Sequence, residues 1–158
     1  MPRRVMMVDD SDSDLLFTRL ALQRCGVPCE VLGFERAQDA LDHLAASPDH
    51  GVDLILLDIN MPVMDGFAFL EAFEALPPAH RGSAVVAMLS SSSDPADRAR
   101  AGGFHSVKGY LTKPLGKAEA AAVLQDVAAR ARGRPGVPPG ELPRGIPSFR
   151  TPGADIPR

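Results

Sequence analysis

Four short apolar runs of the sequence each end on a polar residue that could do chemistry. The clearest is the run Leu54–Leu57, which stops abruptly at Asp58. An apolar run this short, bounded by glycine and polar turn residues, is typical of a strand buried on both faces of a parallel sheet. Ligands of such sheets bind just beyond the carboxyl ends of the strands. The residues in the equivalent position of the other runs are Asp9, Asp10, Ser90 and Lys113.

These residue types, brought together, suit phosphoryl transfer at a divalent metal. Three carboxylates in one place repel one another unless a cation lies between them, and oxygen ligands of this kind favour Mg²⁺. A lysine can contact a phosphoryl oxygen as a point charge, and a carboxylate can attack phosphorus. A serine hydroxyl can donate a hydrogen bond to a second phosphoryl oxygen. The sequence therefore predicts Mg²⁺-dependent formation and hydrolysis of an aspartyl phosphate at Asp58.

Each of these residues also has a plainer structural explanation. Asp9 and Asp10 could only cap a helix, Ser90 could be one of several loop serines, and Lys113 could be a solvated surface lysine. The coincidence of suitable groups at four strand ends favours the functional interpretation.

The elements that must position these groups alternate regularly along the chain. Periodicity and turn residues predict strands over residues 3–8, 29–34, 52–57, 84–89 and 107–111. Helices are predicted over residues 12–24, 36–46 and 65–76, from Pro95 to Gly102, and over 117–132. The first helix is expected to turn Leu15, Leu16, Leu20 and Cys25 toward the core. This pattern predicts an α/β fold: a doubly wound five-stranded parallel sheet with five helices.

The last part of the chain has a different composition. Seven of the fifteen prolines lie in residues 133–158, with no hydrophobic periodicity, so this segment cannot bury enough surface to offset its ordering entropy. We expect one folded domain over residues 1–132 and a flexible Pro/Gly-rich tail over residues 133–158.

Net charge, apolar runs and cysteine content disfavour several classes of protein. The net charge of −3 does not favour a nucleic-acid partner, and no apolar run approaches the roughly 20 residues that span a membrane. The N-terminus lacks the apolar segment of a signal peptide, so a cytoplasmic location is expected. Cys25 and Cys29 have no further cysteine or histidine cluster to complete a zinc site. Free thiols are expected, with a redox-sensitive pair left open.

The motifs together resemble those of the response-regulator receiver domain, of the CheY-like type. The resemblance covers about residues 3–132. It rests on Val8-Asp9-Asp10, on Leu57-Asp58-Ile59-Asn60-Met61-Pro62-Val63-Met64-Asp65-Gly66, on Leu89-Ser90-Ser91 and on Leu111-Thr112-Lys113-Pro114. It implies a flavodoxin-like sheet with strand order 2-1-3-4-5.

The resemblance assigns a role to each matching residue of the metal and phosphoryl site. Asp58 is implied to be the phosphoacceptor. Asp10 is implied to bind Mg²⁺ directly, Asp9 to bind it often through water, and the main-chain carbonyl of Asn60 to complete the metal shell. Lys113 is implied to contact the phosphoryl group.

Three further implications concern the switch and the chain around it. Ser90 matches the hydroxyl switch residue, and Tyr110, the only tyrosine of the chain, matches the aromatic switch on the fifth strand. The Lys113–Pro114 peptide bond is expected to be cis.

The resemblance also implies the partners. A sensor histidine kinase or a phosphotransfer protein would supply the phosphoryl group, and an unknown downstream protein would receive the output, with no nucleic acid or membrane as partner. The family's usual output and dimer surface comprises the fourth helix, the fifth strand and the fifth helix, so a homodimer could form there. The fourth helix is unusually short here, which leaves the partner of that surface open.

We therefore expect a stand-alone response regulator, and not an enzyme with its own catalytic output domain, although autodephosphorylation is expected. One alternative is a receiver-shaped docking module whose interactions ignore phosphorylation. A second is an enzyme that uses an aspartyl-phosphate intermediate on small phosphate esters. That chemistry usually places its nucleophile in a first-strand Asp-x-Asp motif, and the first strand here ends in adjacent aspartates.

Overall fold

The computed structural model describes residues 3–48, 50–61, 63–91 and 94–132. Within these residues the chain folds as strands and helices in alternation. The predicted tail, residues 133–158, lies outside the described residues. The division of the chain into a folded domain and a tail therefore stays a prediction.

Five parallel strands form the sheet, in the order β2-β1-β3-β4-β5. This is the doubly wound, flavodoxin-like arrangement that the sequence predicted. Each strand lies within two residues of its predicted bounds. The strands are β1 (Arg3–Val8), β2 (Cys29–Phe34), β3 (Leu54–Leu57), β4 (Val85–Ser90) and β5 (Val107–Thr112).

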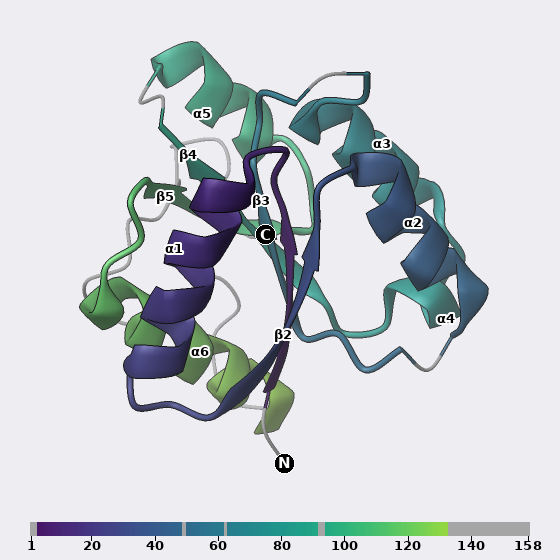
Figure 1. The fold of residues 1–158 in the computed structure, drawn as a ribbon. Helices are drawn as coiled ribbons and strands as arrows, with labels where there is room; N and C mark the ends of the chain where they lie inside the picture. Colours follow the sequence, from purple (N-terminus) through teal and green to yellow (C-terminus); the bar gives the residue numbers. More distant parts are fainter. Residues whose placement is uncertain (1–2, 49, 62, 92–93, 133–158) are drawn as a thin grey trace.

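The helices cover the two faces of this sheet (Figure 1). Helices α1 (Asp12–Arg24) and α6 (Lys117–Arg132) pack together on one face. The opposite face carries α2 (Ala37–Ala46), α3 (Gly66–Ala75) and α5 (Pro95–Gly102). A one-turn helix, α4 (Pro78–Arg81), lies beside α2. No helix in the described ranges is both long enough and apolar enough to cross a bilayer.

Within the described part of the chain, helix α4 adds a sixth helix to the five that the sequence predicted. The Pro77–Pro78 pair was expected only to end the preceding helix. Pro78 instead occupies the first position of a new turn, where a helix does not need the missing N–H group. Gly82 ends that turn with a φ of 57°, and its N–H donates to the carbonyl of Pro78 at 3.0 Å.

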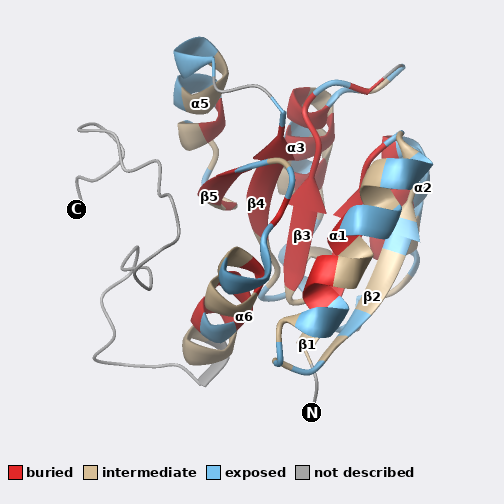
Figure 2. Ribbon diagram, turned by 60° about the vertical axis from the view of Figure 1, so that its left-hand side comes forward, coloured by how far each residue is buried: buried red, intermediate tan, exposed pale blue. Residues whose placement is uncertain are grey.

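The core lies on both faces of the sheet, which explains why the inner strands are apolar throughout. Along β1, Val5 and Met7 pack with α1 and α6, whereas Met6 and Val8 pack with α2 and α3. Strand β3 is buried at every residue, while the edge strand β2 is only partly buried (Figure 2). Solvent therefore reaches the sheet mainly at the loops at the two ends of its strands and along the edge strand β2.

Helix α1 differs from the prediction at Leu16, and Leu20 is only partly buried. Leu16 was expected near the core, but it is 52% exposed, and Phe17 beside it is 59% exposed. The buried face of α1 instead runs through Thr18, Ala21 and Leu22, with Leu15 packed against it. Leu16 lies one residue off this stripe, which rotates its side chain by about 100° around the helix axis.

The two cysteines are partly buried and carry free thiols. The thiol of Cys25 lies 3.1 Å from the carbonyl oxygen of Leu22, at the end of α1, and that of Cys29 lies 3.9 Å from the same oxygen.

Candidate functional site

The predicted site residues meet at the carboxyl edge of the sheet, because parallel strands end there together. Val8 and Leu57 are register partners, so Asp9 and Asp58 follow them side by side. The main chain fixes both residues: the Asp58 N–H donates to the Val8 carbonyl at 2.9 Å, and the Asp9 N–H donates to the Phe34 carbonyl at 3.0 Å. Both carboxylate residues are buried, Asp58 to 7% exposure.

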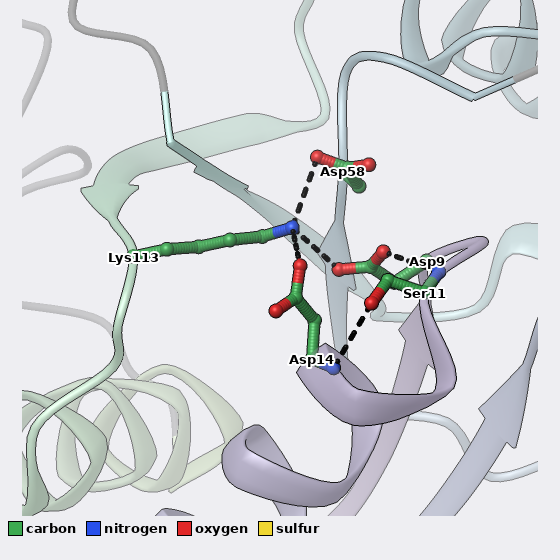
Figure 3. Close-up of polar contacts among 5 residues, drawn as sticks. All are labelled: Asp9, Ser11, Asp14, Asp58 and Lys113. Carbon is green, nitrogen blue, oxygen red and sulfur yellow. Dashed lines mark hydrogen bonds and ion pairs between the residues drawn. The ribbon is translucent and has the colours of Figure 1, made fainter.

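Lys113 reaches across this edge from the end of β5 (Figure 3). Its Nζ lies 2.7 Å from Asp9 Oδ2, 2.8 Å from Asp14 Oδ2 and 3.3 Å from Asp58 Oδ1. The main chain of Lys113 is held by a hydrogen bond from its N–H to the Ser90 carbonyl at 2.9 Å. The following Lys113–Pro114 bond is cis, as predicted.

Asp14 is the contact that sequence reasoning missed. From the sequence alone, its place in the first turn of a helix predicts no more than a favourable interaction with the helix N-terminus. The Ser11 hydroxyl caps α1 by accepting the Asp14 N–H at 3.2 Å. This cap sets Asp14 on the first turn of the helix, with its carboxylate toward Lys113 (Figure 3). The signal that could have found it is its place in the first turn of the helix that begins directly after the Asp9-Asp10 pair.

The carboxylates form a cluster suited to a hard cation. Asp9, Asp10 and Asp58 each offer an oxygen, and these oxygens all lie within 4.8 Å of one another. Burial, together with the negative charge of Asp9, raises the pKa of Asp58 to about 6, although the charge and the hydrogen bond of Lys113 lower it. A divalent cation would relieve this repulsion, and Mg²⁺ takes carboxylate ligands of this kind. The donor set therefore fits Mg²⁺.

The same negative charges stabilise the charged form of Lys113. Burial alone would lower its pKa, but hydrogen bonds with Asp14 and Asp9, together with the charges of Asp58 and Asp9, raise it above its ordinary value. The lysine is therefore fully protonated at neutral pH and can offer its charge to an anion at Asp58.

The loop after Asp58 approaches the site closely. The Gly66 N–H donates to the Ile59 carbonyl at 2.8 Å, and a Cβ at Gly66 would lie 2.5 Å from the Asp58 carbonyl oxygen. Only glycine fits there. Asp65 then caps α3 through the Ala68 N–H at 2.8 Å. Asn60 lies in this loop and is exposed; the role of its carbonyl as a metal ligand stays a prediction.

Ser90 and Tyr110, the predicted switch residues, are both fully buried. Burial raises the pKa of Tyr110, and a side-chain hydrogen bond with Ser90 partly offsets this. The guanidinium of Arg98, on α5, lies 4.7 Å from the centre of the Tyr110 ring. The structure thus links the end of β4 to α5 through one aromatic ring.

The sequence of this chain is similar to those of known regulatory proteins. The chain is 36% identical over 129 residues to the transcriptional regulatory protein PrrA of Mycobacterium tuberculosis, a match that covers 80% of this chain and 50% of PrrA. The chain spans half of the length of PrrA, and smaller shares of longer curated relatives that it also matches.

Solved structures share the fold. The response regulator receiver protein from Dyadobacter fermentans is 33% identical, with a TM-score of 0.71 over 80% of this chain and 98% of that one. The chemotaxis protein CheY4 of Vibrio cholerae is 28% identical, with a TM-score of 0.67 over 80% of this chain and 99% of that one.

A family model gives the most specific match. The model of the response regulator receiver domain matches residues 5–125, which include the whole sheet from Val5 onward and each of the charged residues at its carboxyl edge. Members of this family act in two-component signalling and bind Mg²⁺ at an acidic pocket. The chain belongs to the response regulator receiver domain family.

Proposed function

We propose that Asp58 accepts a phosphoryl group from a sensor histidine kinase or a phosphotransfer protein. Asp9, Asp10 and Asp58 would hold Mg²⁺ there, with the main-chain carbonyl of Asn60 as a further ligand. The observation that carries the proposal is the contact of Lys113 with Asp58 at 3.3 Å inside a cluster of carboxylates. A cation at this distance can bind an oxygen of a phosphoryl group on Asp58.

The transfer step forms one bond and breaks one. A carboxylate oxygen of Asp58 attacks the phosphorus of the phosphohistidine, the P–N bond breaks, and the leaving imidazole nitrogen takes up a proton. Asp58 must be ionised for this attack, which holds for most molecules at neutral pH because its pKa is about 6. In hydrolysis, water attacks the same phosphorus, the bond between phosphorus and Asp58 breaks, and inorganic phosphate leaves.

The protein contributes position and charge to both steps. Lys113 balances the negative charge that builds up on the phosphoryl oxygens, and the register of β1 and β3 keeps Asp9 beside the nucleophile. Bound Mg²⁺ would add further charge neutralisation and hold a phosphoryl oxygen.

The phosphoryl group would then change the surface around α5 and β5. We propose that the Ser90 hydroxyl turns to donate to a phosphoryl oxygen and so gives up its hydrogen bond with Tyr110. The guanidinium of Arg98 lies over the Tyr110 ring, so a change in the position of this ring would alter the surface of α5. Phosphorylation would thereby bias a two-state surface that a partner protein reads. Whether the receiver acts alone stays a prediction.

Phosphorylation by a small donor tests the proposal. Incubation with acetyl phosphate and Mg²⁺ should add one phosphoryl group, seen by intact-mass spectrometry, and chelation of Mg²⁺ should prevent it. Asp58→Asn should abolish the modification. Asp53→Asn, at the opposite edge of the sheet, is the matched control and should keep it. Unchanged modification of Asp58→Asn would refute the assignment.

The alternative function, a docking module whose interactions ignore phosphorylation, predicts a different result for partner binding. It predicts equal affinity for a partner with and without phosphoryl analogue, even if Asp58 can be modified in the test tube.

A further inference from the structure

Among the described residues, Asp14 is the one carboxylate in contact with Lys113 to which the proposed phosphoryl transfer assigns no role. Its Oδ2 lies 2.8 Å from Lys113 Nζ, nearer than the 3.3 Å between that nitrogen and Asp58. The lysine therefore divides its hydrogen bonds among three carboxylates, and the nucleophile has the longest of the three contacts.

The main chain holds Asp14 in place. Its N–H donates to the Ser11 hydroxyl, and the N–H of Ser11 donates to Asp9 Oδ1 at 3.0 Å, so the cap of α1 is tied to the site. The Asp14 side chain is 39% exposed, while Asp9 and Asp58 are 8% exposed. Solvent therefore screens the pair of Asp14 with Lys113 more than the two buried pairs, which makes it the easiest of the three to exchange.

We propose that Asp14 is a positioning residue that holds Lys113 in the unphosphorylated protein and gives it up when a phosphoryl group arrives at Asp58. This inference rests on the proposed function. In the free protein Asp14 draws the ammonium toward α1. In the phosphorylated protein the ammonium moves to the phosphoryl oxygens, and Asp14 remains as a negative charge close to an anion.

This role predicts opposite effects on two ligands of the same site. Removal of the Asp14 charge should favour a phosphoryl analogue, because Lys113 no longer leaves a partner and the anion no longer meets a nearby carboxylate. The same removal should weaken Mg²⁺ binding, because the site loses a negative charge and Lys113 is free to move toward Asp9 and Asp58. A loss of structure at the site would weaken both ligands.

The test uses Asp14→Asn with Asp12→Asn as the matched control. Asp12 lies on the same turn of α1 and is exposed, and it makes no hydrogen bond or ion pair with Lys113 among the described residues. Titration calorimetry measures Mg²⁺ alone, and then beryllofluoride at saturating Mg²⁺. For Asp14→Asn we expect beryllofluoride affinity to rise about three- to tenfold and Mg²⁺ affinity to fall about two- to threefold. Asp12→Asn should change either by less than about twofold.

Two further variants keep the test decisive. Asp14→Glu restores a carboxylate and should return both affinities toward the wild-type values, and Asp14→Ala replaces Asp14→Asn if the latter folds poorly. Beryllofluoride affinity that is unchanged or lower in the charge-removing variant overturns the inference, as does an equal effect of Asp12→Asn. If the wild-type protein fails to bind beryllofluoride, or Asp58→Asn binds it equally well, the proposed function itself fails. Asp58-dependent binding with no effect of Asp14 removes only the inference.

Discussion

The sheet has an amino edge, where its parallel strands begin, and a carboxyl edge, where they end. The two carry similar numbers of charged residues but arrange them differently. At the amino edge, cations and anions alternate and satisfy one another. The Arg4 side chain pairs with Glu30 at 3.1 Å, Asp53 accepts the Arg4 N–H at 2.9 Å, and Arg3 lies 3.8 Å from Asp53. His50, buried nearby, accepts the Val52 N–H and hydrogen-bonds the His80 carbonyl.

At the carboxyl edge the charges are not balanced. Asp9, Asp14 and Asp58 share the ammonium of Lys113, and Asp10 adds a fourth carboxylate beside them. The pKa of Asp58 is raised there, whereas the paired carboxylates of the amino edge need no further cation. The amino edge stabilises the fold, and the carboxyl edge holds negative charge in excess, which suits a metal cation.

The largest expected effect comes from removing Lys113, the only ammonium that contacts the carboxylates of this edge among the described residues. Lys113→Ala should slow phosphorylation by acetyl phosphate on the order of a hundredfold, since loss of one preorganised charge on developing oxyanions has this magnitude. Lys117→Ala, on the exposed start of α6, is the control and should keep the wild-type rate. A Lys113→Ala rate within a few-fold of wild type would mean that the lysine does not contact the reacting group.

A second large effect is expected at Gly66. Gly66→Ala places a Cβ 2.5 Å from the Asp58 carbonyl oxygen, so the main chain of the phosphoacceptor must shift. We expect a loss of about 2 to 4 kcal/mol in the free energy of unfolding, as for other overpacked positions, measured by urea denaturation. Gly103→Ala is the matched control, because its Cβ meets its nearest neighbour at an ordinary 3.4 Å. Equal costs at both glycines would contradict the close approach.

The same change, aspartate to asparagine, should have opposite signs at the two edges. The pKa of Asp58 is raised from 3.8 to about 6, so the folded protein binds this proton more tightly than the unfolded chain. The contribution of Asp58 is therefore most favourable below pH 4 and is lost as the pH rises through 6. Without Mg²⁺, Asp58→Asn should stabilise the protein by about 2 to 3 kcal/mol at pH 7 and by much less at pH 4.

At the amino edge, Asp53→Asn removes the negative partner of Arg3 and weakens the acceptor of the Arg4 N–H. It should destabilise the protein by about 1 kcal/mol at pH 7. Thermal unfolding of both variants at the two pH values, with chelator present, gives the comparison. Destabilisation by Asp58→Asn at pH 7 would remove the central distinction between the edges.

The smallest effect is expected in the loop that follows Asp58. Val63 has a φ of 72°, a conformation that β-branched residues rarely adopt, and its side chain is fully exposed. Val63→Gly should therefore raise the free energy of unfolding slightly, by up to about 1 kcal/mol, since relief of strain exceeds the entropic cost of glycine. Val27→Gly, in the partly buried turn after α1, serves as the contrast and should destabilise.

Sequence reasoning located the carboxyl edge because its signal is local. Asp58 and Lys113 each directly follow an apolar strand, so both could be found without knowing any contact. The sixth helix was missed because a single turn of residues has no periodicity to detect, and the exposure of Leu16 because one residue of helical phase separates a buried leucine from an exposed one.

The contacts of Asp14 and Gly66 could not be predicted for another reason. The partner of Asp14 is Lys113, ninety-nine residues further along the chain, and only the order of the strands brings the two together. Gly66 reads as a common helix start, and its necessity depends on how closely α3 approaches the Asp58 main chain. Such constraints arise from packing between elements and have no pattern within one element.

The comparison of the two edges is tested most directly by mapping where a phosphoryl analogue acts. Backbone amide chemical shifts should be recorded by NMR for the protein before and after addition of Mg²⁺ and beryllofluoride. We predict the largest changes at Asp9, Asp58 and Lys113, with further changes at Ser90, and almost none at Arg4 or Asp53. Changes centred on the amino edge, or none at Asp58, would contradict the account.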